Sequence, residues 1–222
     1  MSDFPFSIVG FDLDGTLLDT LDDLGAAVNH ALALADRSPV PVAEVRHLIG
    51  GGARKMLERA LDLTGGIDEA AFEPLYRELL EFYTANIAVH TRLYPGGEAM
   101  LDGLAARGVQ LAVATNKVES LARQLLDELG LSSRFAAVIG GDTLGPGRAK
   151  PARDMIDEMV ARLGGGRAAF VGDTTYDIRA ARAAGVPCVA VSFGFHDKPP
   201  HELGADAVID HFDELIATLM RL

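Results

Sequence analysis

Short runs of apolar residues recur along the chain and alternate with segments in which apolar residues return every three or four positions. The runs have the length of buried strands, and the periodic segments have the spacing of helices. Glycines that follow several periodic segments predict left-handed helix ends at Gly108, Gly130 and Gly185. This alternation predicts an α/β fold with a doubly wound, mostly parallel sheet. We expect its strands at 8–11, 110–114, 136–140, 168–171, 188–191 and 207–209.

Residues 18–93 interrupt the alternation. They contain no convincing strand, and their apolar residues have helical spacing. Tyr94-Pro95-Gly96 then marks the return to the alternating pattern. We therefore predict an inserted α-helical cap domain at 18–93 and an α/β catalytic core made of 1–17 and 94–222.

The chain has 222 residues, of which 49% are hydrophobic, and a formal charge of −12. This length allows one sizeable core and a smaller accessory domain. So acidic a surface repels nucleic acid. No apolar stretch approaches the roughly 18 to 20 residues that cross a bilayer, and the N-terminus lacks the basic region of a secretion signal. We expect a cytoplasmic monomer or homodimer that binds neither nucleic acid nor membrane.

Asp12 and Asp14 follow the first predicted strand, and Gly15 and Thr16 then break it. Residues two apart on a strand face the same side, so the two carboxylates can converge on one substrate. One carboxylate at such a position can attack phosphorus to form an aspartyl phosphate, while the other moves protons, and both can help to hold a divalent cation. Ordinary turn chemistry is the alternative, because Asp and Gly are common in turns.

Asp173 and Asp177 follow the predicted strand at 168–171. As acids at a helix start, they could serve only to stabilise that helix. Together with Asp12 and Asp14, they form a set of the hard oxygen ligands that Mg²⁺ prefers. We expect Asp12, Asp14 and Asp173 to bind Mg²⁺ and Asp177 to orient the site. A bound cation also reverses the local negative charge that otherwise repels an anionic substrate.

Two further polar segments are candidates for the site. Thr115 and Asn116 precede a predicted helix at 118–129, where they could be only a helix cap, although helix starts also bind phosphate. Lys150 ends a long glycine-rich loop and precedes Pro151. A single lysine in a loop is ordinarily solvated, so the residues alone do not assign it a role.

The string FDLDGTLLDT at 11–20 resembles the nucleophile motif of the haloacid dehalogenase-like superfamily of phosphatases. The three other polar segments occur in the order of that superfamily's remaining motifs. The resemblance assigns the Thr115 hydroxyl and the Asn116 amide to the transferred phosphoryl group. It assigns Lys150 to the neutralisation of the nucleophile and the phosphoryl oxygens. The Ala-Arg-Asp sequence after Pro151 departs from the second proline that close relatives usually show, which leaves the local turn open.

Three segments narrow the resemblance to phosphoglycolate phosphatases: 50–54, 86–96 and 203–210. This resemblance implies a magnesium-dependent enzyme that hydrolyses 2-phosphoglycolate to glycolate and phosphate. Asp12 is then the nucleophile, and Asp14 protonates the leaving alkoxide and later activates water.

Substrate choice is expected in the cap. Gly51 and Gly52 allow backbone amides to approach a substrate carboxylate closely. Arg54 follows these glycines at a predicted helix start, where its guanidinium could bind the same carboxylate. The alternatives are a plain connecting loop and a solvated helix arginine.

Rival functions share parts of this pattern. A phosphatase for another small ester, such as a sugar phosphate, has the same core, because a fold does not choose a substrate. A phosphomutase has the same Asp pair but must shield its phosphoenzyme from water. Asp14 argues against a dehalogenase, which needs no second carboxylate there. A non-catalytic binding protein is the rival outside enzymology, and the occupied catalytic positions argue against it.

Overall fold

The computed structural model describes residues 4–66 and 69–222. Its main sheet has six parallel strands in the order β5-β4-β1-β6-β7-β8. The strands are β1 (Ile8–Phe11), β4 (Gln110–Ala114), β5 (Ala137–Ile139), β6 (Ala168–Gly172), β7 (Cys188–Val191) and β8 (Ala207–Ile209). All six predicted strands are confirmed, within one residue at each end. β1 lies at the centre, between β4 and β6, so the residues after these three strands meet at one edge of the sheet.

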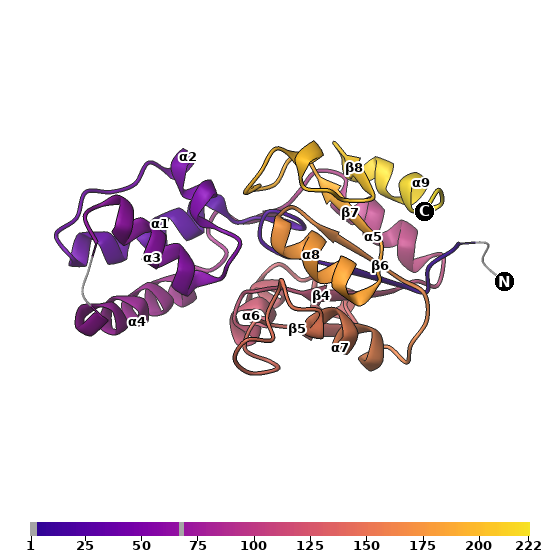
Figure 1. Ribbon diagram of the computed structural model, residues 1–222, viewed down its shortest axis with the longest axis horizontal. Helices are drawn as coiled ribbons and strands as arrows, with labels where there is room; N and C mark the ends of the chain where they lie inside the picture. Colours follow the sequence, from indigo (N-terminus) through magenta and orange to yellow (C-terminus); the bar gives the residue numbers. More distant parts are fainter. Residues whose placement is uncertain (1–3, 67–68) are drawn as a thin grey trace.

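Helices cover both faces of this sheet (Figure 1). One face packs against α5 (Gly97–Ala105), α6 (Glu119–Glu128) and α9 (Leu215–Leu219), and the other packs against α7 (Asp154–Arg162) and α8 (Thr175–Ala184). Alternate residues of β1 supply the two cores: Val9 and Phe11 join the first, and Ile8 joins the second. Gly108, Gly130 and Gly185 have φ values of 75°, 68° and 72°, which confirms the predicted left-handed helix ends.

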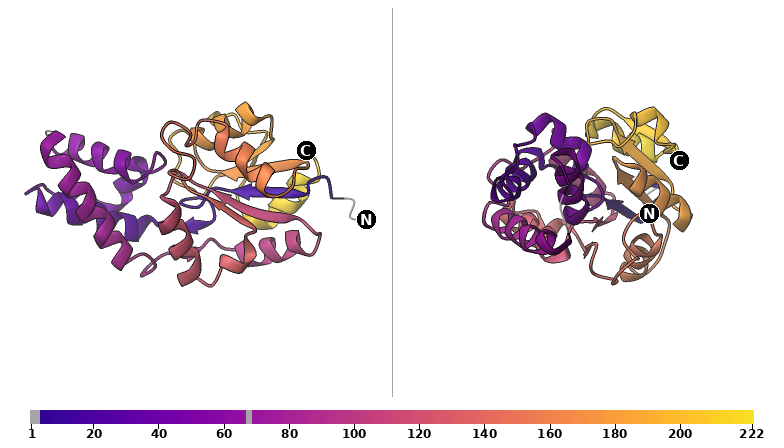
Figure 2. Two further views of the ribbon diagram at one scale, coloured as in Figure 1. Left: turned by 90° about the horizontal axis from the view of Figure 1, so that it is seen from below. Right: turned by 60° about the vertical axis from the view of Figure 1, so that its left-hand side comes forward.

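The segment between β1 and α5 forms a separate group of helices at one end of the molecule (Figures 1 and 2). These are α1 (Leu21–Leu34), α2 (Val42–Val45), α3 (Ala53–Leu63) and α4 (Glu69–Ala85). We call this group the cap helices. The expectation that 18–93 contains no strand is wrong at its two ends. There β2 (Leu18–Asp19) pairs antiparallel with β3 (Arg92–Leu93), because the outgoing and returning chains run side by side. Strands of two residues are too short to show a period in the sequence.

Loops of the cap helices contact loops of the sheet. The Asn116 side chain donates from Nδ2 to the carbonyl oxygen of Gly50, at 3.2 Å. Arg59 of α3 donates to the Tyr176 hydroxyl of α8, at 3.3 Å. The cap helices therefore lie closed over the edge of the sheet that carries the polar residues. Among the described residues, no helix is both long and apolar enough to cross a membrane.

Candidate active site

The three central strands deliver the predicted polar residues to one place. Asp12 follows β1, Thr115 follows β4, and Asp173 follows β6. These strands are neighbours and parallel, so their carboxyl ends lie side by side. All three residues are buried, at 6% exposure or less. The sheet therefore gathers residues that are more than 160 positions apart in the chain.

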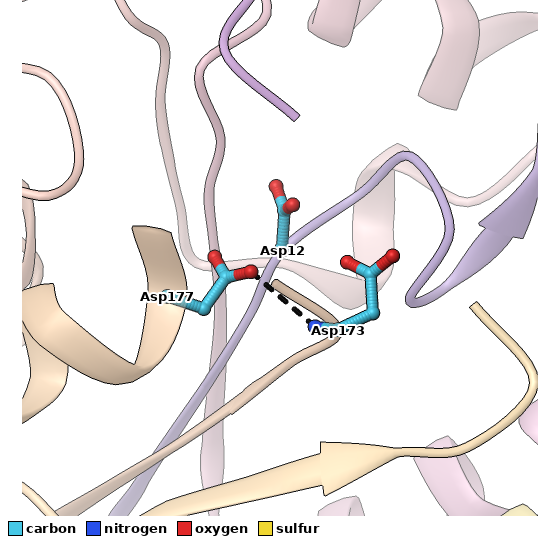
Figure 3. Close-up of side chains that lie close together, drawn as sticks. All are labelled: Asp12, Asp173 and Asp177. Atoms are coloured by element: carbon cyan, nitrogen blue, oxygen red, sulfur yellow. Dashed lines mark hydrogen bonds between the residues drawn. The ribbon is translucent and has the colours of Figure 1, made fainter. Parts of the chain in front are cut away.

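Asp12, Asp173 and Asp177 form a carboxylate cluster. One oxygen from each lies within 4.8 Å of the others, and their carboxyl groups occupy the same side of the loop after β6 (Figure 3). Three carboxylates so close together repel one another strongly in a buried site. Hard oxygen donors with excess negative charge are the ligands that a divalent cation such as Mg²⁺ requires.

Lys150 supplies part of the missing positive charge. Its Nζ lies 2.9 Å from Asp12 Oδ1 and 2.6 Å from Asp177 Oδ1, and its side chain is 1% exposed. Burial by itself lowers the pKa of Lys150, but the charges of Asp12 and Asp177 outweigh this effect and raise the pKa above its usual range. The lysine therefore stays charged. Sequence alone did not distinguish this buried cation from a solvated loop lysine.

A single lysine does not balance the charge of the three carboxylates. Burial raises the pKa of Asp12 to about 6, against the lowering effect of Lys150. Burial also raises the pKa of Asp173 well above its usual range, and the charges of Asp177 and Asp12 raise it further. The site therefore retains an excess of negative charge that a bound cation would relieve.

Hydrogen bonds hold Asp173 and Asp177 in place. Asp173 accepts from the Thr16 hydroxyl at 3.0 Å and from the backbone N–H of Phe195 at 2.7 Å. Asp177 Oδ2 accepts from the Thr174 backbone N–H and hydroxyl, at 3.0 and 2.7 Å, and from the Asp173 N–H at 3.3 Å. Asp177 thus closes the start of α8 and fixes the loop that carries Asp173. This is the arrangement that an orienting residue needs.

Asp14 lies apart from this cluster. Both of its carboxylate oxygens accept hydrogen bonds from Lys117 Nζ, each at 2.8 Å. Within the described residues, the close cluster of possible metal ligands comprises Asp12, Asp173 and Asp177, and the structure does not bring the Asp14 carboxylate into it. Asp14 does line the same pocket as Asp12. The Asp14 carboxylate is therefore paired with Lys117 in the pocket and not with the cluster.

Thr115 and Asn116, which follow β4, make different contacts. Thr115 lines the pocket, and its hydroxyl accepts a long hydrogen bond from the Lys117 N–H, at 3.3 Å. Asn116 donates to the carbonyl oxygens of Gly50 and Lys150. Its Oδ1 is buried without a hydrogen-bond partner among the described residues. Asn116 thus ties a cap loop to the loop that carries Lys150.

Gly50 and Gly52 line the pocket on the cap side, and Gly51 lies between them. Gly52 has a φ of 89°, which favours glycine, and a Cβ on it would lie 3.0 Å from the Asn116 carbonyl oxygen. Glycine at 52 thus permits close contact between the two loops. Gly51 is not among the described residues that line the pocket, and no substrate contact follows from this packing alone.

Arg54 lies outside the pocket. Its guanidinium forms a two-bond pair with Glu73 of α4, at 2.6 and 3.0 Å, and packs over the Tyr76 and Phe72 rings at 4.5 and 5.2 Å. Its side chain is 46% exposed. Arg54 is not one of the described residues that line the pocket. The structure therefore does not bring the predicted cap arginine to the other site residues.

A family comparison agrees with this geometry. The model of the haloacid dehalogenase-like hydrolase family matches residues 9–191. The chain belongs to that family. Its phosphoglycolate phosphatase relative from Agrobacterium fabrum is 44% identical over 94% of this chain and 90% of its own length. The phosphoglycolate phosphatase of Caulobacter vibrioides is 42% identical over 96% of this chain and 90% of its own length.

Solved structures show the same fold. The crystal structure of a predicted phosphoglycolate phosphatase from Haemophilus somnus superposes with a TM-score of 0.90, at 30% identity, over 96% of this chain and 98% of that one. A putative phosphoglycolate phosphatase from Lactobacillus delbrueckii superposes with a TM-score of 0.85, at 28% identity, over 99% of both chains. This haloacid dehalogenase-like hydrolase therefore shares the whole architecture of these proteins, cap helices included.

Sequence reasoning missed several contributors to the site of this hydrolase. Lys117 follows Thr115 and Asn116 and has no role in the sequence analysis, although a lysine shortly after a strand at the ligand edge is a usable signal. Thr16 and the Phe195 N–H hold Asp173, and nothing in the sequence links them to it. Tyr83 of α4 reaches the pocket from the cap, which its helical spacing did not distinguish from core packing.

Proposed function

We propose that this protein is a magnesium-dependent phosphatase that hydrolyses 2-phosphoglycolate to glycolate and phosphate through an aspartyl-phosphate intermediate. The observation that carries the proposal is the buried Asp12 carboxylate, which lies 2.9 Å from Lys150, lines a pocket, and belongs to a carboxylate cluster. The names of the relatives from Agrobacterium fabrum and Caulobacter vibrioides support the choice of substrate.

Asp12 is the proposed nucleophile. A carboxylate oxygen of Asp12 attacks phosphorus, the bond from phosphorus to the glycolate oxygen breaks, and an aspartyl phosphate forms. Lys150 stays charged beside Asp12 and favours its ionised, nucleophilic form. Water then attacks the phosphorus of the intermediate, which returns the Asp12 carboxylate and releases phosphate.

Asp14 is the proposed acid and base. It lines the pocket two residues from Asp12, so it can reach the leaving oxygen of a substrate bound at Asp12. It gives a proton to the glycolate alkoxide in the first step and takes one from the attacking water in the second. Thr115 also lines the pocket. Its hydroxyl and the amide of Asn116, which precede α6, provide donors for the phosphoryl oxygens.

The residues of the cluster fit a magnesium ion. Asp12 and Asp173 would hold it, and Asp177 would keep Asp173 in position through the loop that the two residues share. The observation that supports a cation here is that three buried carboxylates lie close together with a single lysine between them. When bound, Mg²⁺ would offset the charge that develops on the transferred phosphoryl group.

Phosphate release tests the proposal. The purified protein is given 2-phosphoglycolate, several sugar phosphates and p-nitrophenyl phosphate, with Mg²⁺ or with excess EDTA. We expect the highest kcat/KM for 2-phosphoglycolate and no turnover in EDTA. A preference for a sugar phosphate would overturn the substrate, an isomerised sugar phosphate in place of free phosphate would indicate a mutase, and turnover in EDTA would overturn the metal. The Asp12→Asn variant is the control for contaminating phosphatases.

A further inference from the structure

The pocket contains one cationic lining residue among the described part of the chain, and it is Lys117. The other lining side chains are the acids Asp12 and Asp14, a few neutral polar groups, and apolar groups from the cap helices and α6. A substrate that carries a carboxylate as well as a phosphate needs a positively charged partner for each end. Lys150 lies next to Asp12, at the phosphoryl end. Lys117 is the cation that remains for the other end.

Lys117 is placed close to the reacting group. Its Nζ contacts Asp14, which lies two residues from Asp12, and two residues of extended chain span at most ~7 Å. The carboxylate of phosphoglycolate is separated from its phosphate by a single CH₂ group and the ester oxygen. So short a substrate, held at Asp12, reaches a cation only if that cation lies within this range.

Tyr83 provides a second, independent observation. The residue is 2% exposed and lines the pocket from α4. Lys117 lies close enough to interact with the buried Tyr83 hydroxyl oxygen, but no acceptor for the hydroxyl proton is present among the described residues. The Tyr83 ring lies 4.7 Å from Lys117 Nζ. A buried tyrosine O–H usually has an acceptor, so one without an acceptor beside a cation indicates a place for an anionic group.

We propose that Lys117 Nζ and the Tyr83 hydroxyl together bind the carboxylate of the substrate. The inference deepens the proposed function and rests on it. Lys117 comes from the sheet domain and Tyr83 from the cap helices, so this carboxylate subsite is complete only when the cap is closed. In the substrate-free protein, both carboxylate oxygens of Asp14 accept hydrogen bonds from Lys117 Nζ. Substrate binding replaces one of these contacts and frees an Asp14 oxygen to face the ester oxygen.

Arg54, the cap residue that the sequence favoured for this role, has other side-chain partners. Both of its terminal nitrogens bind Glu73, and it packs on the Tyr76 ring outside the pocket. To bind the substrate, Arg54 would have to give up these contacts and move into the pocket. Lys117 needs no such movement, because it already lines the pocket.

The test compares two substrates and three variants. 2-Phosphoglycolate and its carboxamide, glycolamide phosphate, have the same size and the same phosphate, and they differ in the carboxylate charge. The variants are Lys117→Met, Tyr83→Phe and Arg54→Met, of which the last is the matched control. The measured quantity is selectivity, the ratio of kcat/KM for the acid to kcat/KM for the amide. This ratio cancels any general damage to Asp14, because both substrates need the same proton transfer.

We expect selectivity to fall by about 10- to 100-fold in Lys117→Met and by about tenfold in Tyr83→Phe, the range for hydrogen bonds to charged groups. Arg54→Met should keep the selectivity of the wild type. Wild-type selectivity in both Lys117→Met and Tyr83→Phe would overturn the subsite, as would a selective loss confined to Arg54→Met. If Lys117→Met does not fold, Tyr83→Phe and competitive inhibition of the wild type decide. Glycolate should then inhibit the wild type much more strongly than glycolamide, and Tyr83→Phe should reduce that difference.

This result is separable from the proposed function itself. A wild type that hydrolyses the acid and the amide equally well would show that the enzyme does not recognise a carboxylate, and the proposed substrate would then fail. A wild type that prefers the acid, with variants that keep this preference, would leave the substrate intact and remove only Lys117 and Tyr83 from its recognition.

Discussion

Lys150→Met is expected to destabilise the protein strongly in the absence of metal. Lys150 lies 2.9 Å from Asp12 and 2.6 Å from Asp177, and the three side chains are 1%, 9% and 0% exposed. Removing one partner from so buried a group leaves uncompensated charge, which costs roughly 3 to 5 kcal/mol. Because solvent does not screen the contacts of Lys150 with the two carboxylates, we expect a loss of stability within this full range. For a chain of 222 residues, this loss corresponds to a fall in Tm of about 6 to 20 °C.

Thermal unfolding in EDTA measures this loss, with Arg153→Met as the matched control. Arg153 pairs with Asp157 at 2.5 Å, but the two side chains are 56% and 44% exposed, so solvent screening should leave this ion pair with little effect on stability. A second thermal unfolding measurement, made with Mg²⁺, tests whether the cation relieves the charge of the cluster. The cation should raise the Tm of Lys150→Met by more than that of the wild type, because it meets a more negative cluster. At saturating Mg²⁺, the variant should still have a reduced kcat.

The reasoning fails if Lys150→Met loses no more stability than Arg153→Met in EDTA. That outcome would mean that the carboxylates of the cluster adjust their protonation at little cost. An equal response of the variant and the wild type to Mg²⁺ would separately refute the argument that the cation relieves the charge of this cluster.

Three further variants test other parts of the site. Asp12→Asn should fold normally by circular dichroism and lose at least ~10³-fold in kcat, about 4 kcal/mol, and near-normal turnover would remove Asp12 from its role as nucleophile. Asp173→Asn should raise the Mg²⁺ concentration for half-maximal activity, because a charged ligand becomes neutral, and an unchanged titration would place the metal elsewhere. Gly52→Ala should lower kcat/KM, since its Cβ would lie 3.0 Å from the Asn116 carbonyl oxygen at a φ of 89°. Gly108→Ala has a similar φ of 75° and open space around the Cβ, so equal effects in the two glycine variants would refute a role for the loop contact.

The strands of the sheet and the ends of several helices could be predicted from sequence because both depend on local chemistry. A buried parallel strand is apolar on both faces, so it reads as a short continuous run, and all six runs are strands. Gly185 and similar residues end helices through a left-handed backbone that glycine adopts most easily. The pair β2 and β3 escaped prediction because it depends on two distant segments meeting.

The carboxylate cluster was also predictable in outline. Asp12 and Asp173 each follow a strand, and parallel strands bring their carboxyl ends together whatever the details of packing. Strand order was not predicted from the sequence or from the family resemblance of the motifs, and it is the structure that places β1 between β4 and β6. The position of Lys150 depended on that resemblance, because a loop lysine has no local pattern that predicts burial between two carboxylates.

Only the tertiary structure decided which partners the remaining side chains have. Lys117 and Asp14 are 103 positions apart, and their pairing depends on β4 lying beside β1. Arg54 and Tyr83 both belong to cap helices, but α3 turns Arg54 toward Glu73 while α4 turns Tyr83 into the pocket. Helical spacing fixes which residues share a face, and it does not fix what that face meets. The amino-acid sequence therefore determined the elements and the acidic chemistry, whereas the packing of the cap helices and the sheet decided which cation lines the pocket.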